Sequence, residues 1–376
     1  MAGTLGQIAF FSALIVVIVI HEAAHFGMAK WFGIKVEEFF VGFGPRIWSR
    51  RRGETEYGFK WIPAGGYVKI AGMNPYQPAP PEDLPRTFGA KPIWQRAWVI
   101  FAGPATHFVL AFICFAAWLM LVGQPIERNP QLDRVPALMD GKPGPAFEAG
   151  LRSGDRILAI DGIDDPSTDV VVAYMQAHVG ESVTFLVDRD GTELEFEVVP
   201  VMSVVEGEPT ARIGVVLGDA IVVRQTDGLV SAVIGGAELV WDTSVQTIVN
   251  IGRIFGPQGI GRMAQLLFTD APREITDPRS VVGIGQVAGQ TASGGYAGDL
   301  LYLFALVNVF IGLLNLLPLP PFDGGHLAVL GIEKIRGKQV DMRKVVPVSV
   351  AVAAFFIVFT VSVIYLDVVK PGSLAP

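Results

Sequence analysis

The sequence predicts a polytopic α-helical membrane protein that carries a β-rich extracytoplasmic segment. Of its 376 residues, 51% are hydrophobic and only 17% are charged, whereas soluble globular chains average about 25% charged residues. Four segments contain the roughly 20 apolar residues that a membrane-spanning helix needs. The net charge of −7 argues against nucleic acid as a partner, and the single cysteine excludes an internal disulfide and a thiolate zinc cluster.

The four apolar segments define the expected order of elements. The first segment has no basic start and no small-residue cleavage site, and it contains three ionisable residues, so we interpret it as a retained helix rather than a signal peptide. The predicted order is a first transmembrane helix (1–34), a connection (35–96), a second transmembrane helix (97–123), an extracytoplasmic segment (124–225), amphipathic helices with a loop (226–299), a third transmembrane helix (300–332), a cytoplasmic loop (333–344) and a fourth transmembrane helix with the tail (345–376).

The basic residues predict the orientation. Eleven Lys and Arg side chains lie between residues 30 and 96 and five between residues 334 and 344, whereas the N-terminal stretch has none and the tail has only Lys370. By the positive-inside rule, both connections face the cytoplasm. We therefore expect a multi-pass protein of the inner or plasma membrane, with both termini and the segment 124–299 on the extracytoplasmic side.

The extracytoplasmic segment divides by pattern. Residues 134–202 predict a compact β-rich domain with a helical stretch near 170–177, and an Asp-Gly turn at 190–191 joins two alternating strands into a hairpin. Residues 229–268 have apolar positions at helical spacing, which favours amphipathic helices against the membrane surface. Residues 269–299 contain clustered glycines and two prolines and predict a loop.

Ionisable residues inside the apolar segments are the most informative feature. Of the 36 acidic residues, only Glu22 and Asp323 lie there, together with the histidines at 21, 25, 107 and 326. A charge at mid-bilayer costs about 2.5–3.5 kcal/mol on insertion scales, so such a residue is a functional hypothesis by default.

His21, Glu22 and His25 form an H-E-x-x-H motif. Positions i and i+4 share one helix face, so both imidazoles can reach one ion, and zinc accepts nitrogen and oxygen ligands. The alternative interpretation is a packed helix with hydrogen-bonded histidines. Asp323 supplies the third ligand by elimination, and it follows three prolines that break the helix, which membranes tolerate only where backbone is buried in protein or faces water. The alternative interpretation of Asp323 is an aspartate in a proline-kinked helix that is hydrogen-bonded to a neighbouring helix.

These motifs, in this order and spacing, resemble the site-2 proteases, which are intramembrane zinc metalloproteases, and in particular the bacterial regulator-of-sigma-E protease type. Segments 40–45 and 51–57 are similar to actinobacterial members. The other matching segments are residues 62–69, 91–96, 102–104 and 315–325.

The resemblance implies a role for each matching residue. His21, His25 and Asp323 would bind one Zn²⁺ per chain, Glu22 would be the general base, and Asn315 would position substrate or stabilise the oxyanion. His107 replaces the asparagine of many members. Its role is left open: it would donate a hydrogen bond toward the site, contact a metal or act as a pH-sensitive group. The alternative is a histidine that is hydrogen-bonded between helices. Residues 36–70 would form a membrane-associated β-hairpin that adds a substrate strand at Gly65, Gly66 and Tyr67.

The resemblance also implies substrates and partners. Residues 144–162 resemble a PDZ core, which would act as a size filter or as a clamp for a peptide C-terminus. The substrates would be single-pass transmembrane proteins such as anti-sigma factors or signal-peptide remnants, cut within the lipid bilayer after a first cut by an upstream extracytoplasmic protease.

Two other functions compete with this prediction. A non-catalytic PDZ membrane scaffold or receptor would need a structural metal but would gain nothing from Glu22. An ion-coupled transporter would be expected to show inverted repeats, and none is evident in the sequence.

Overall fold

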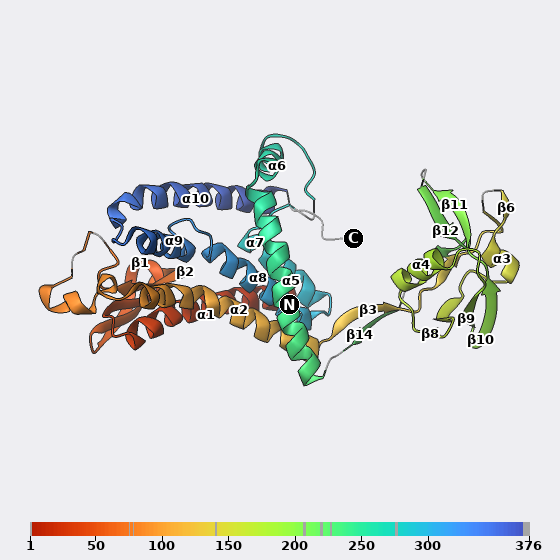
Figure 1. Ribbon diagram of the computed structural model, residues 1–376, viewed down its shortest axis with the longest axis horizontal. Coiled ribbons are helices and arrows are strands. Elements are labelled where there is room, and N and C mark those ends of the chain that lie inside the picture. Colours follow the sequence, from red (N-terminus) through yellow and green to blue (C-terminus); the bar gives the residue numbers. More distant parts are fainter. Residues whose placement is uncertain are drawn as a thin grey trace. The chain divides into compact units, whose positions relative to one another are not determined.

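The computed structural model describes residues 2–74, 76–77, 79–139, 141–205, 208–218, 221–225, 228–274 and 277–370. The chain forms two compact units (Figure 1). The helical unit comprises Met1–Leu121 with Asp227–Pro376, and the β-rich unit comprises Val122–Thr226.

Within the described residues, four helices are long and apolar enough to cross a membrane, as predicted. The candidate spans are Ala2–Trp31, Ile93–Leu121, Ala297–Asn315 and Met342–Val369. They contain the helices α1 (Ala2–Trp31), α2 (Ile93–Leu121), α8 (Leu300–Asn315) and α10 (Val346–Val369). A short 3₁₀ turn precedes each of the last two: η3 (Ala297–Asp299) before α8 and η4 (Met342–Lys344) before α10.

The third predicted transmembrane helix, residues 300–332, is two helices in the structure. The span ends with α8 at Asn315, and α9 (Asp323–Arg336) begins a new helix that runs beyond the predicted boundary at 332 into the predicted loop 333–344. The prolines at 318, 320 and 321 explain the break because they cannot donate a backbone hydrogen bond. The structure therefore places Asp323 at a helix start rather than inside a span.

The segment after the β-rich unit is more helical than predicted. The two expected helices are α5 (Leu229–Phe255) and α6 (Pro257–Phe268), but the predicted loop 269–299 contains a further helix, α7 (Val281–Ser293). The glycines of α7 misled the prediction because they are poor helix formers. They are used for close packing against α1: a β-carbon at Gly285 would come within 2.8 Å of the ring of Phe11.

The predicted hairpin at 36–70 is present as β1 (Val36–Arg52) and β2 (Thr55–Ile70). The antiparallel register pairs Arg52 with Thr55 near the turn and Val36 with Ile70 at the far end. Residues 38–41 pair with 56–59 as well as with 66–69, so the first part of β1 lies between two parts of β2. The segment that carries Gly66 is thus the outer partner of β1. Two short 3₁₀ helices, η1 (Pro81–Arg86) and η2 (Phe88–Ala90), lead from the hairpin to α2.

Helix α2 is the centre of the helical unit. It packs against α1, α5, α8 and α9, and α1 also packs against α7. Buried apolar clusters form at both ends of these contacts, one joining α1, the hairpin, α2 and α9 and another joining α2 with α8. Because α1, α2 and α9 share the first of these cores, α1, which carries His21, is held close to α9, which carries Asp323.

The β-rich unit extends beyond the predicted domain 134–202. Its sheet has the order β10-β9-β7-β8, and its core is built around residues such as Ile157, Phe185 and Met175. The predicted hairpin is β9–β10 and the predicted helix is α4. The unit reaches the limits of the predicted segment 124–225 because short edge strands pair its two ends: β3 pairs with β14 and β4 with β13. The elements are β3 (Gln124–Arg128), β4 (Leu132–Arg134), β5 (Leu138–Met139), β6 (Lys142–Pro143), α3 (Pro145–Ala149), β7 (Arg156–Ile160), β8 (Ile163–Asp164), α4 (Thr168–Ala177), β9 (Val183–Arg189), β10 (Thr192–Val198), β11 (Val201–Val205), β12 (Glu208–Arg212), β13 (Val216–Leu217) and β14 (Ile221–Gln225).

Candidate metal centre

Three predicted ligand residues converge in the helical unit. His21 and His25 lie one turn apart on α1, which continues unbroken to Trp31, so both rings project from one face. Asp323 is the first residue of α9. The two glycines that follow it allow this helix start to lie close to the preceding turn, since a β-carbon at Gly324 would come within 2.2 Å of the carbonyl oxygen of Leu316.

The donor atoms form a nearly equilateral triangle. Oδ2 of Asp323 lies 3.3 Å from Nε2 of His21 and 3.4 Å from Nε2 of His25. The two Nε2 atoms are 3.1 Å apart. A tetrahedral zinc site with bonds of about 2.0–2.1 Å places its ligands about 3.3 Å from one another. The triangle therefore fits three corners of such a site and leaves the fourth open, the composition of a catalytic zinc centre.

Each histidine has a partner for its other ring nitrogen. Nδ1 of His25 lies 2.8 Å from the carbonyl oxygen of Val99 on α2. A carbonyl can only accept, so Nδ1 carries the proton and Nε2 keeps its lone pair for a metal. Nδ1 of His21 lies 3.0 Å from Nε2 of His107, also on α2. His107 is thus buried beside the candidate ligands, with 2% of its surface exposed.

A cleft of about 770 Å³ opens beside the triangle. It is lined largely by apolar side chains, most of them on α1, and the predicted residues Glu22, Gly65, Gly66, His107 and Asn315 all contribute to it. Glu22 lies next to the first ligand and faces this space, where it can exchange a proton with a reacting group. The structure therefore brings one catalytic and four positioning candidates to a single cavity.

The hairpin reaches the cleft through the segment around Gly66. A β-carbon at Gly66 would lie 3.0 Å from Cγ of Glu22, so the backbone of β2 passes directly over this carboxylate. Tyr67 turns away: its ring stacks on Phe40, its hydroxyl donates to Glu38, and it accepts from Lys60. Burial and the bond to Glu38 raise the pKa of Tyr67. The side chain of Tyr67 is thus committed to the hairpin, and it does not line the cleft.

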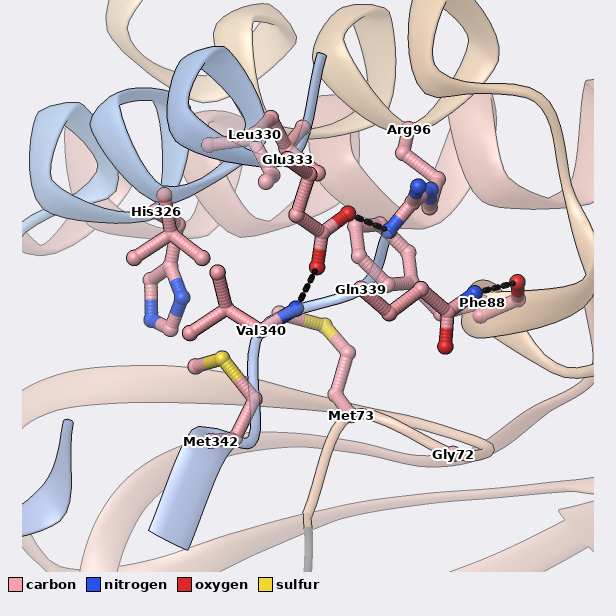
Figure 2. A pocket seen from close by; sticks show the side chains of 13 residues that line it. Gly72, Met73, Phe88, Arg96, His326, Leu330, Glu333, Gln339, Val340 and Met342 are labelled. Atoms are coloured by element: carbon pink, nitrogen blue, oxygen red, sulfur yellow. Dashed lines mark hydrogen bonds and ion pairs between the residues drawn. The ribbon is translucent and has the colours of Figure 1, made fainter. Parts of the chain in front are cut away.

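His326 lies in a separate cavity of about 80 Å³ behind α9. Figure 2 shows it at one side of this pocket, with Glu333 between Arg96 and the backbone of Val340. The Arg96–Glu333 ion pair is 2.7 Å long and almost fully buried, and Oε1 of Glu333 accepts from the Val340 amide. These contacts tie α9 to α2 and so help to hold Asp323 in place.

Two neighbours of the centre were missed from the sequence. The carbonyl of Val99 carries no sequence signal, because any residue supplies one. Asn308 of α8 is fully buried beside His107, with Oδ1 3.2 Å from its Nδ1. It is the single amide inside the otherwise apolar run 303–314 of α8, and that isolation is the signal that would have identified it.

Two histidines and an aspartate in tetrahedral arrangement, with a glutamate beside the first ligand, define the class of zinc metalloproteases. The sequence profile of Peptidase family M50 matches residues 9–360. Zinc metalloprotease Rip1 of Mycobacterium tuberculosis (strain H37Rv) is 30% identical over 97% of this chain and 98% of its own. Rip1 of Mycolicibacterium smegmatis is also 30% identical, over 98% of both chains.

The chain belongs to peptidase family M50. It is a zinc metalloprotease of the site-2 protease type, and zinc is its cofactor. The resemblance seen in the motifs is thereby confirmed, and the family assignment decides against the scaffold and the transporter. Together with the four apolar helices, it makes this a membrane protein.

Proposed function

We propose that this enzyme cleaves single-pass transmembrane proteins within the bilayer, with His21, His25 and Asp323 as its zinc ligands. The observation that carries the proposal is the location of the donor triangle, whose two histidines lie inside the apolar helix Ala2–Trp31. His21 is nine residues before Lys30, or about 13 Å along a helix. With Lys30 at the interface, a substrate bond must enter the membrane to reach the site.

Different residues of the chain have different roles in the reaction. Bound zinc supplies a Lewis acid that activates water and polarises the scissile carbonyl. Glu22 takes a proton from the attacking water and returns it to the leaving amine, because it is the carboxylate next to the ligands that faces the cleft. Asn315 lines the same cleft, and its amide would orient the substrate carbonyl. His107 also lines the cleft, but both of its ring nitrogens already have partners in His21 and Asn308.

The hairpin accounts for how a helical substrate becomes cleavable. Peptide bonds in a transmembrane helix are shielded by their own hydrogen bonds, so the substrate must unwind locally. The β2 segment with Gly65 and Gly66 lines the cleft and lies beside Glu22, so an added substrate strand would place its backbone at the catalytic centre.

The decisive test is Glu22→Gln in full-length protein co-expressed with candidate single-pass substrates such as anti-sigma factors and signal-peptide remnants. We expect cleavage fragments to disappear while zinc content stays near one ion per chain. Glu238→Gln, an exposed change on α5, is the matched control and should cleave normally. Unchanged cleavage by Glu22→Gln would refute the base, and loss of zinc in this variant would make Glu22 a ligand instead.

We further propose that the β-rich unit and both termini are extracytoplasmic and that the zinc site is nearer the cytoplasmic face. The basic residues of the two connections support this orientation. Single cysteines introduced at Ser182 and Lys338 in a Cys114→Ser background should react with a membrane-impermeant maleimide from opposite sides of sealed cells. Equal labelling from outside would overturn the orientation.

The β-rich unit we propose to be a PDZ domain that admits substrates already trimmed by an upstream extracytoplasmic protease. Its entry and exit lie together, because Gln124 pairs with Gln225. Replacing residues 124–225 with a short linker should therefore spare the helical unit. A size filter predicts cleavage of untrimmed substrate by this deletion variant, whereas a peptide clamp predicts weaker cleavage of every substrate.

A further inference from the structure

His107 and Asn308 form a chain of hydrogen bonds that ends on His21. Nδ2 of Asn308 donates to the carbonyl oxygen of Phe304 at 2.8 Å, one turn earlier on α8. Oδ1 of Asn308 lies 3.2 Å from Nδ1 of His107, and Nε2 of His107 lies 3.0 Å from Nδ1 of His21. Asn308 and His107 are both buried, with exposures of 0% and 2%.

The chain has a fixed direction because one end of it can only accept. The Phe304 carbonyl requires the amide NH₂ of Asn308, so the amide oxygen must face His107. Nδ1 of His107 must then carry a proton, and Nε2 of this neutral ring is an acceptor. Nδ1 of His21 donates to it, which leaves the Nε2 lone pair of His21 directed at Asp323 and the metal position.

The two candidate zinc ligands therefore obtain the same tautomer in different ways. A backbone carbonyl fixes His25 directly, and no substitution of a side chain removes that carbonyl. His21 depends on two side chains from α2 and α8. We propose that His107 and Asn308 are positioning residues that set the metal-binding tautomer of His21, an inference that rests on the proposed role of His21 as a zinc ligand.

This inference separates the two side chains from a packing role. Asn308→Leu keeps the branched shape of the side chain but removes both the acceptor for His107 Nδ1 and the donor to the Phe304 carbonyl. The His107 ring is then free to protonate Nε2, which would force His21 to accept on Nδ1 and to carry its proton on Nε2. His107→Leu removes the acceptor for His21 itself, and His107→Gln restores one at similar reach.

The experiment measures zinc affinity of full-length, detergent-solubilised protein by competition with a chromophoric chelator. His107→Leu and Asn308→Leu should each weaken zinc binding about 10–100-fold, the usual effect of losing a partner that orients a ligand. His107→Gln should stay close to wild type, and Asn308→Leu should add little in that background. His178→Leu, the same change at the histidine outside the apolar segments, should have no effect. A loss of zinc affinity in His107→Gln as large as that in His107→Leu would instead indicate a packing role.

A second measurement reads the tautomer in wild-type protein and uses a variant only to assign a signal. Labelling the five histidines with ¹⁵N allows NMR to report the tautomer of each ring in wild-type protein, and His107→Gln assigns the missing signal. We expect His107 to be protonated on Nδ1 with or without zinc. Protonation on Nε2, or unchanged zinc affinity in both leucine variants, would overturn the inference. Zinc retained by His21→Ala would instead refute the proposed ligand set and leave the His107 tautomer result standing.

Discussion

Gly103 of α2 lies against the ring of His25 so closely that a β-carbon at position 103 would come within 2.2 Å of Nε2, the atom that faces Asp323. The same β-carbon would lie 2.7 Å from Cε1 of His21. Because Gly103 is inside a packed helix, neither the backbone of α2 nor that of α1 can move aside without disturbing the core between them. The absence of a side chain at position 103 is thus a condition for the candidate metal centre.

Gly103→Ala should therefore abolish zinc binding and cleavage together, although alanine is the better helix former. The added methyl group must push one or both imidazoles out of the donor triangle. Zinc content of the purified protein and cleavage of a co-expressed substrate are the measurements. Gly27→Ala is the matched control, because a β-carbon at Gly27 on α1 meets nothing within 4 Å. Full zinc occupancy in Gly103→Ala would contradict this account.

Gly66→Ala should separate catalysis from metal binding. The new methyl group would lie 3.0 Å from Cγ of Glu22 and 3.1 Å from the carbonyl oxygen of Phe40, so the carboxylate must shift by a few tenths of an ångström. Because small displacements of a catalytic group are costly, we expect kcat to fall about 10–100-fold. Zinc content should remain that of wild type. A variant that loses zinc, as Gly103→Ala should, would place Gly66 in the candidate metal site rather than over Glu22.

The elements that the sequence predicted well are those with strong local signals. The apolar helices follow from composition, and the H-E-x-x-H motif follows from its spacing on one of them. Asp323 was found because a carboxylate in an apolar segment is rare. In each case the relevant property belongs to neighbouring residues, so a single sequence is sufficient to detect it.

The remainder depends on contacts between distant segments. Helix α7 was missed because its glycines lower intrinsic helix propensity, whereas packing on α1 determines the outcome. The partner of His107 was missed because Asn308 is 201 residues away. The side chain of Tyr67 points away from the cleft that Gly66 lines because successive residues of a strand point to opposite faces, so the predicted strand addition would use only its backbone.

The buried ion pair between Arg96 and Glu333 provides a stability prediction. Their charged groups are 2.7 Å apart, and their side chains are only 6–7% exposed. Glu333→Leu leaves the Arg96 guanidinium buried without its counter-charge, which costs about 3–5 kcal/mol in comparable pairs. Thermal unfolding in detergent should show the loss, and zinc affinity should fall with it because α9 carries Asp323.

The double variant Arg96→Leu/Glu333→Leu is the control for this prediction. Replacing both charges by apolar groups removes the uncompensated cation, so the double variant should be more stable than Glu333→Leu alone. A double variant less stable than either single one would show that the pair acts through packing and not through its charges.

The ionisation of Glu54 makes the stability of the contact between α1 and the hairpin depend on pH. Its carboxylate accepts from Arg86, with both guanidinium contacts at 2.8 Å, and from Lys30 at the end of α1. These cations lower the pKa of Glu54 to about 2, compared with about 4.3 in an unfolded chain. Since the folded-state pKa is the lower one, the ionised carboxylate stabilises the fold above about pH 4.3, and this contribution is lost as the pH falls toward 2.

Glu54→Gln should therefore lower the melting temperature at pH 7 by no more than a few degrees, because a partly exposed ion pair contributes little. The difference from wild type should shrink steadily below about pH 4.3, where the wild-type protein loses the same interaction by protonation. Thermal unfolding in detergent across this range is the measurement, with the exposed Glu82→Gln as the control. A gap between Glu54→Gln and wild type that stays constant down to about pH 2 would mean that the glutamate stabilises the connection by packing and not through its charge.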